Sequence, residues 1–327
     1  MVVAIPTNDG RSQRLVRLVD ADETPVRTLP IPESQLQIWS NQGAVASAKL
    51  THESIRKALT DKSSPIANMK CEVYLQGSYK NDTNIRGDSD VDVVVQLDSS
   101  FMPDTSALPD ADKVLYKSAF SDATYIWDKF KADVRKALRA YYGSSAVSEG
   151  RKALKIPGAS GRLNADVLAC FQYRKYLRFR SGTDQAFIEG VEFFAPAENR
   201  WIINFPKLHY ENGVRKNAQP ATAGMYKPIV RMFKNARTYL SDRSMIPNGL
   251  VASYFLECLL YNVSDSLFGT QYQQAFVNIV NWLTKADLSK FVCQNGQTQL
   301  FGNTPEQWST SNADQLVIKL IELWNNW

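Results

Sequence analysis

Three aspartates dominate the chemistry that this sequence could perform. Asp90 and Asp92 stand two positions apart in a run that becomes β-branched, so on a strand both side chains leave one face, about 7 Å apart along the chain. Adjacent carboxylates repel each other and are costly to bury unpaired, so they favour a divalent cation. Oxygen ligands without His or Cys beside them favour magnesium or manganese. The alternative is a solvated acidic edge made of Asp88, Asp90 and Asp92.

A Gly-Ser pair precedes the two aspartates. Ser78 lies twelve positions before Asp90, and Gly77 and Ser78 follow a strand-like run. A glycine at such a turn lets the backbone approach a phosphate closely, and exposed N–H groups and the serine hydroxyl can donate hydrogen bonds to it. The pattern therefore predicts a phosphate site beside a metal site. The alternative is that Gly77 only permits a tight turn.

A third carboxylate is expected because two metals that bridge a nucleophile and a phosphoryl group usually need three acidic ligands. Asp166 is the candidate, since it is a charged residue inside the otherwise apolar segment 163–170. A buried position is unfavourable for a carboxylate unless it binds something. The alternative is an aspartate at a strand edge that faces water.

The elements that position these residues follow from hydrophobic periodicity. Helical spacing over 32–59, interrupted near Gly43, is followed by strand patterns and one further helix, then by a second half with helical patterns only. The first half contains predicted strands over 72–76, 91–97 and 163–173, a hairpin of 191–194 with 201–205, and a helix over 125–142 that ends before Gly143. The second half contains predicted helices over 228–240, 250–261, 271–283 and 312–324. We predict a mixed α/β lobe followed by a helical lobe.

Composition excludes several classes of protein. The chain has 327 residues, 44% hydrophobic and 22% charged, with 38 Lys+Arg against 33 Asp+Glu and a net charge of +5, which is typical of a globular protein and not of a disordered or collagen-like one. No apolar run is long enough to span a bilayer or to form a signal peptide, so we expect a cytoplasmic protein. Four scattered cysteines and two histidines argue against zinc and disulfide frameworks. The mild basic excess suits a protein that holds polyanionic small molecules.

The Gly-Ser turn, the Asp-Val-Asp strand and the later single Asp resemble the polymerase-β-like nucleotidyltransferase superfamily. A closer resemblance, to the bacterial cGAS/DncV-like nucleotidyltransferases (CD-NTases) of clade E, is carried by residues 76–95, 172–176, 200–210, 231–237 and 253–257. It extends from about residue 32 to the C-terminus. It implies an α+β fold: a nucleotidyltransferase core over 32–210, a helical C-terminal lobe over 211–327, and an active site in the cleft between them. Residues 1–31 are then a leader outside the resemblance.

The resemblance also assigns roles to single residues. Asp90, Asp92 and Asp166 match the metal-binding acidic triad, and Gly77 and Ser78 match the turn that holds the donor triphosphate. The resemblance further implies that Lys234 and Ser253 in the second lobe contact a triphosphate. It also implies that Asn204 recognises uracil. Without the resemblance, these residues would be interpreted as a solvated lysine on an amphipathic helix, an N-cap serine and a strand-end asparagine.

The activity implied is that of a cyclic dinucleotide synthase. It would join UTP and ATP into 3′,3′-cyclic UMP–AMP with Mg²⁺ (Mn²⁺ is possible), release pyrophosphate, and act as the signal generator of an antiphage (CBASS) operon whose effector protein reads the product. No nucleic acid or membrane is required. One alternative is a template-independent enzyme that adds nucleotides to RNA 3′ ends with the same triad. Another is a catalytically idle RNA-binding module on the same fold.

Overall fold

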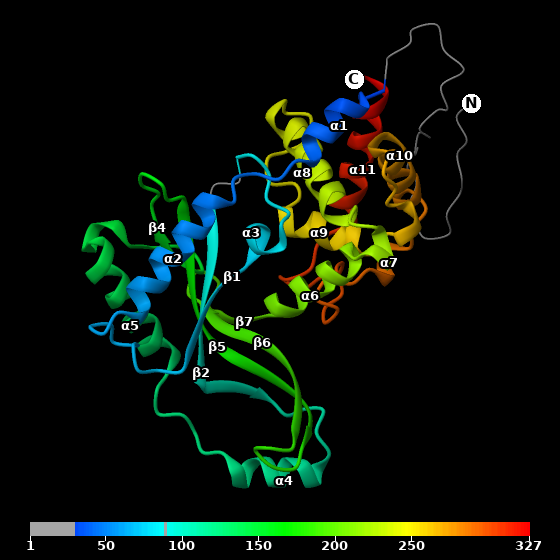
Figure 1. Cartoon of the computed structure of the whole chain (residues 1–327). Coiled ribbons are helices and arrows are strands. Elements are labelled where there is room, and N and C mark those ends of the chain that lie inside the picture. The colour runs from blue at the N-terminus through cyan, green and yellow to red at the C-terminus, as the bar shows by residue number, and fades with distance from the viewer. Residues whose placement is uncertain (1–29, 88–89) are drawn as a thin grey trace, which may run out of the picture. The chain divides into compact units, whose positions relative to one another are not determined.

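The computed structural model in Figure 1 describes residues 30–87 and 90–327. The predicted leader therefore lies outside the described residues, except for its last two positions. The chain forms two compact units. A mixed unit comprises Ala44–Asn81 and Gly87–Tyr210, and a helical unit comprises the described residues up to Gly43 together with Asp82–Arg86 and Glu211–Trp327. Neither unit is a single stretch of sequence.

One seven-stranded sheet builds the mixed unit. Its strands are β1 (Cys71–Leu75), β2 (Asp90–Asp104), β3 (Ser148–Glu149), β4 (Leu154–Ile156), β5 (Asn164–Phe179), β6 (Gln185–Ala195) and β7 (Arg200–Asn204). β2 and β5 pair in parallel and every other pairing is antiparallel. β5 pairs with β2 along one edge, and with β4 and then β6 along the other. The mixed sheet with helices that we predicted is confirmed.

Two helices cover one face of this sheet, namely α2 (Ala46–Thr60) and α5 (Trp127–Tyr142). They pack on the buried valines Val91, Val93 and Val95 of β2. Because side chains alternate along a strand, the even-numbered positions of β2 face away from these helices. The α5 helix ends before Gly143, as predicted, and Gly143 has φ +95°.

Two helices of the mixed unit were not predicted, α3 (Gly77–Asn81) and α4 (Asp110–Ala119). α3 has only five residues, which is too short for a periodic pattern. α4 has no fully buried residue, and its apolar residues Val114 and Leu115 are exposed.

The helical unit has one hydrophobic core, and most of the helices that build it are coloured yellow to red in Figure 1. Its helices are α1 (Glu33–Ser40), the C-terminal part of α6 (Pro206–Asn217), α7 (Gln219–Thr222), α8 (Tyr226–Asp242), α9 (Ser253–Tyr261), α10 (Tyr272–Leu283) and α11 (Thr310–Asn325). The predicted helix over 32–59 is two helices, and its first part belongs here because Leu36 and Trp39 are buried in this core. Within the described residues, no helix combines the length and apolarity needed to cross a membrane.

Candidate active site

The strand register brings the three predicted acids to one face of the sheet. Asp92 of β2 is directly opposite Asp166 of the parallel strand β5, and Asp90 is opposite Asn164. Residues opposite each other in a ladder project from the same face. Asp90 and Asp166 are partly exposed, with 38% and 29% of their side-chain surface accessible. Carboxylates 74 positions apart in sequence, Asp92 and Asp166, thus become neighbours.

A lysine that the sequence analysis did not select lies at these acids. The Lys155 Nζ is 3.3 Å from the Asp166 Oδ1 and 4.0 Å from the Asp90 Oδ2. A cation held between two of the carboxylates shows that the acids fit a cation, and their all-oxygen donor set suits Mg²⁺ or Mn²⁺. Across the described part of the chain, no three acidic, His or Cys side chains converge into a ready metal site.

The Gly-Ser turn lies directly against one of these acids. The Gln76 backbone N–H donates to the Asp92 carbonyl at 2.9 Å, and α3 begins at Gly77 with φ +64°. A Cβ added to Gly77 would overlap the Asp92 Oδ2 and lie 3.1 Å from its Cγ. Gly77 is therefore required both by its backbone conformation and by the carboxylate beside it. Ser78, the next residue, shares this turn, so the predicted phosphate and metal positions are adjacent.

A polar network continues along the same face of the sheet. Gln96, four positions after Asp92 on β2, accepts a hydrogen bond from the Tyr74 hydroxyl at 2.8 Å and donates to Glu189 at 3.0 Å. Lys207 donates to the same carboxylate at 2.6 Å. Burial opposes ionisation of Glu189, but the hydrogen bonds from Lys207 and Gln96 outweigh it and lower its pKa. This wall of the site is therefore charged and held in place by its own partners.

Asn204 lies at the end of β7 and is exposed. It pairs with Val191 of β6, which pairs with Gln172 of β5, so its side chain is on the face that carries the acids. Gln172 is six positions after Asp166, which corresponds to about 20 Å along β5. Asn204 and the triad thus lie on the same face of the sheet, but they are not neighbours. Its role in reading a base stays a prediction.

Lys234 lies on α8, as predicted, but inside the helical unit. Its side chain is fully buried, and its Nζ donates to the Glu257 Oε1 at 2.7 Å and to the Thr83 carbonyl at 3.0 Å. The Thr83 hydroxyl donates to the same Glu257 oxygen at 2.7 Å. Glu257 is therefore the counter-charge that makes this burial tolerable. A triphosphate contact would require the ammonium to leave this network, and that contact stays a prediction.

Ser253 is the first residue of α9, and Ala252 is the N-cap, so the helix begins three residues later than predicted and Ser253 is not an N-cap serine. Its hydroxyl accepts a hydrogen bond from Arg237 of α8 at 3.3 Å, and Arg237 also donates to the Val251 carbonyl at 3.0 Å. A helix start with an arginine beside it suits an anion. Arg237 was not selected from sequence because an arginine on a helix face is most often solvated.

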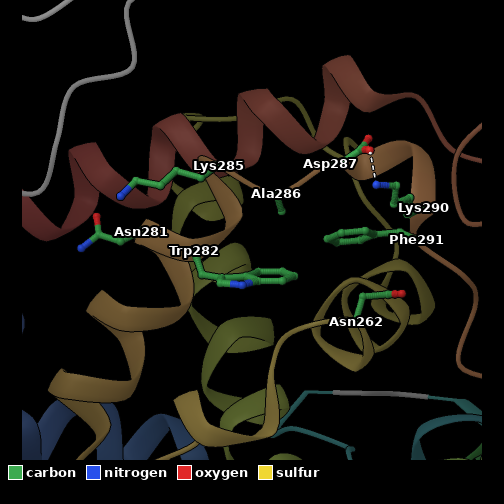
Figure 2. Close-up of a pocket in the computed structure, with 8 residues that line it drawn as sticks. All are labelled: Asn262, Asn281, Trp282, Lys285, Ala286, Asp287, Lys290 and Phe291. Carbon is green, nitrogen blue, oxygen red and sulfur yellow. Dashed lines mark ion pairs between the residues drawn. The ribbon is translucent and has the colours of Figure 1, made fainter. Parts of the chain in front are cut away.

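A pocket of about 480 Å³ lies in the helical unit, and none of the predicted site residues lines it. Figure 2 shows Trp282 and Phe291 beside each other, with ring centroids 5.7 Å apart, and the ion pair of Lys290 with Asp287 at 3.2 Å. All of its lining residues lie between Asn262 and Phe291. They include no member of the triad and neither residue of the Gly-Ser turn, so we do not place the chemistry here.

Family models match both halves of the chain. A nucleotidyltransferase domain model matches residues 52–146, and a model described as the cGAS/DncV-like nucleotidyltransferase C-terminal helical domain matches residues 211–325. The second match corresponds to the helical unit, and the first contains the Gly-Ser turn and two of the three acids.

Several known proteins are similar over most of the chain. A cyclic UMP-AMP synthase of Rhodothermus marinus is 54% identical over 299 residues, which covers 91% of this chain and 99% of that protein. The solved structure of this synthase with Apcpp and Upnpp has a TM-score of 0.82, covering 91% of this chain and 98% of that one. The cyclic nucleotide synthase CdnE01 of Staphylococcus haemolyticus is 42% identical, covering 91% and 100%. A cyclic dipurine nucleotide synthase of Elizabethkingia meningoseptica is 34% identical, covering 76% and 82%.

Proposed function

The chain belongs to the cGAS/DncV-like nucleotidyltransferases, and from this premise we propose that it is a cyclic dinucleotide synthase whose product is 3′,3′-cyclic UMP–AMP. The base choice is supported by 54% identity to a cyclic UMP-AMP synthase, against 34% to a cyclic dipurine synthase. The substrates are then UTP and ATP. A messenger of this kind acts through a separate effector protein, and we assign the enzyme to antiphage (CBASS) signalling in the cytoplasm.

The observation that carries the mechanism is the contact between Gly77 and Asp92. A phosphate turn whose glycine touches a carboxylate places donor-phosphate oxygens beside an acid that can share a cation with them. In the proposal, Gly77 and Ser78 bind the donor triphosphate through backbone N–H groups and the Ser78 hydroxyl. The three acids Asp90, Asp92 and Asp166 hold the divalent cations.

Each transfer forms one P–O bond, breaks another P–O bond and moves one proton. The 3′-oxygen of one nucleotide attacks the α-phosphorus of the other, the hydroxyl proton goes to Asp166, and pyrophosphate leaves. Two bound divalent cations, which we take to be Mg²⁺ with Mn²⁺ as a substitute, supply a lower pKa at the 3′-hydroxyl and charge neutralisation at the pyrophosphate. A linear dinucleotide forms first. It is then cyclised by the same residues, and a second pyrophosphate is released.

The remaining residues are assigned to substrate recognition. We propose that Ser253 contacts a triphosphate with the help of Arg237, whose guanidinium already touches its hydroxyl. Lys234 is assigned to the same triphosphate. To bind it, the Lys234 ammonium must give up its ion pair with Glu257 and contact phosphate oxygens instead. Asn204 is assigned to the uracil edge, since an amide offers both an acceptor and donors.

The test is to incubate the purified chain with the four ribonucleoside triphosphates and Mg²⁺ or Mn²⁺, treat with phosphatase, and identify the resistant products by mass spectrometry. We expect a phosphatase-resistant UMP–AMP ring. A different ring would overturn the base assignment and leave the mechanism intact. Labelling of added RNA without any ring would favour an RNA-tailing enzyme.

A matched variant tests the acids in the same assay. Asp90→Asn together with Asp92→Asn removes two negative charges from partly exposed positions and keeps side-chain size, so the fold should persist. We expect pyrophosphate release to disappear. Release at the wild-type rate would overturn the assignment of the acids to the divalent cations.

A further inference from the structure

Lys155 is the charged residue at the triad that has no role so far. It lies on β4, where it pairs directly with Asp166 of β5, so both side chains leave the same face of the sheet. Its Nζ contacts Asp166 at 3.3 Å and reaches Asp90 on β2 at 4.0 Å. One ammonium therefore bridges carboxylates that come from two different strands.

The turn before β4 holds the stem of this lysine. A Cβ added to Gly150 would lie 3.2 Å from the Lys155 Cε and 3.3 Å from its Cγ, closer than side chains normally approach. The Gly150 N–H donates to the Ala153 carbonyl at 2.8 Å, which closes the turn. A glycine at this position thus lets the aliphatic stem lie against the backbone and directs the ammonium toward the acids.

We propose that Lys155 is the counter-cation of the metal-free triad and that a divalent cation must displace its ammonium to bind. The proposal rests on the metal role assigned above to Asp90, Asp92 and Asp166. Three aligned carboxylates repel one another, and an ammonium at 3.3 Å and 4.0 Å from two of them relieves that repulsion. A metal ion bound to these acids would need the carboxylate oxygens that the ammonium contacts, so the two cations compete for the same oxygens.

The ammonium links acids that the strand register does not pair. Asp90 of β2 is opposite Asn164, not Asp166, and the Lys155 Nζ lies 4.0 Å from Asp90 and 3.3 Å from Asp166. Lys155 is therefore a positioning residue: it keeps the acids in place before metal binds, and it weakens metal binding by competing for the same oxygens.

The test measures Mn²⁺ binding to the full chain, without nucleotide, from the loss of the free-Mn²⁺ signal in electron paramagnetic resonance. For a partly exposed pair we expect Lys155→Met to bind Mn²⁺ about two- to fivefold more tightly than the wild type. Lys155→Arg keeps the cation and should match the wild type. The matched control is Lys152→Met, since Lys152 lies on the same hairpin with similar exposure (47% against 51%) but pairs with Glu198 at 3.1 Å.

Three outcomes would overturn the proposal: an unchanged or weaker affinity in Lys155→Met, an equal gain in Lys152→Met, or the same gain in Lys155→Arg. Thermal unfolding of each variant checks that it is folded, and Lys155→Gln replaces the methionine variant if that one is not. Asp90→Asn with Asp92→Asn separates this proposal from the one on which it rests. If that double variant binds Mn²⁺ as the wild type does, the metal role of the acids fails, whatever Lys155 does.

Discussion

Replacing Gly77 by alanine should disable the enzyme through a carboxylate, not through the turn alone. Two effects add at this position. The backbone has φ +64°, where a non-glycine residue is less stable by about 1–2 kcal/mol. The new Cβ would also overlap the Asp92 Oδ2, so the carboxylate would have to move by on the order of 1 Å, a displacement that can lower a catalytic rate by about 100-fold.

Gly161→Ala is the control that separates the two effects. Gly161 also has positive φ, +78°, belongs to the same unit, and has no atom within 4 Å of an added Cβ. Both variants should lower the unfolding temperature by about 2–8 °C, but only Gly77→Ala should lose about 100-fold in the rate of pyrophosphate release from UTP and ATP with Mg²⁺. If Gly77→Ala loses no more activity than Gly161→Ala, the contact between turn and carboxylate has no catalytic role.

Three further predictions concern other parts of the molecule. Lys234→Met should destabilise the protein by about 3–5 kcal/mol in urea unfolding, because it leaves Glu257 buried without its counter-charge. Adding Glu257→Gln should recover most of the loss. A mild effect of the single variant would contradict this prediction. Burial, with the nearby Asp104 carboxylate, raises the pKa of Glu192 from 4.5 to about 7. Between these two pH values the folded protein keeps a proton that the unfolded chain releases. The free energy of unfolding should therefore fall as pH rises from about 4.5 to about 7. Glu192→Gln should flatten that part of a urea-midpoint profile, and an unchanged slope would assign it to other groups. Asn204→Ser should shift the products seen by mass spectrometry from uridine toward purine rings, and an unchanged spectrum would refute base reading by Asn204.

Local sequence was sufficient for several of the longer elements and for the direction of their side chains. The alternation of Val91 and Val93 with Asp90 and Asp92 predicted that both acids share the face opposite the core, and the register confirms it. The end of α5 before Gly143 was likewise predicted, because a glycine accommodates the positive φ found there. Such features depend on residues a few positions apart, which the sequence places in order.

Pairing between distant segments was decided by the tertiary structure. Periodicity predicted a strand around Asp166, but only the parallel register of β2 and β5 places it opposite Asp92. Lys155 was not predicted as a site residue because the three residues of β4 are too few to show a pattern. Its position at the acids results entirely from the pairing of β4 with β5. Lys234 fits an amphipathic helix equally well as a solvated or as a buried residue, and the position of Glu257 on the next helix decides between them.

The sequence by itself thus determined which residue types could bind a phosphate and a divalent cation, since that follows from their chemistry and local spacing. The tertiary structure alone decided which of them meet. It set the contact of Gly77 with Asp92, brought Lys155 to the acids, and placed Leu36 and Trp39 in the helical core. The physical reason is that hydrophobic periodicity specifies an element and its buried face, whereas the partner of that face is selected by packing over the whole chain.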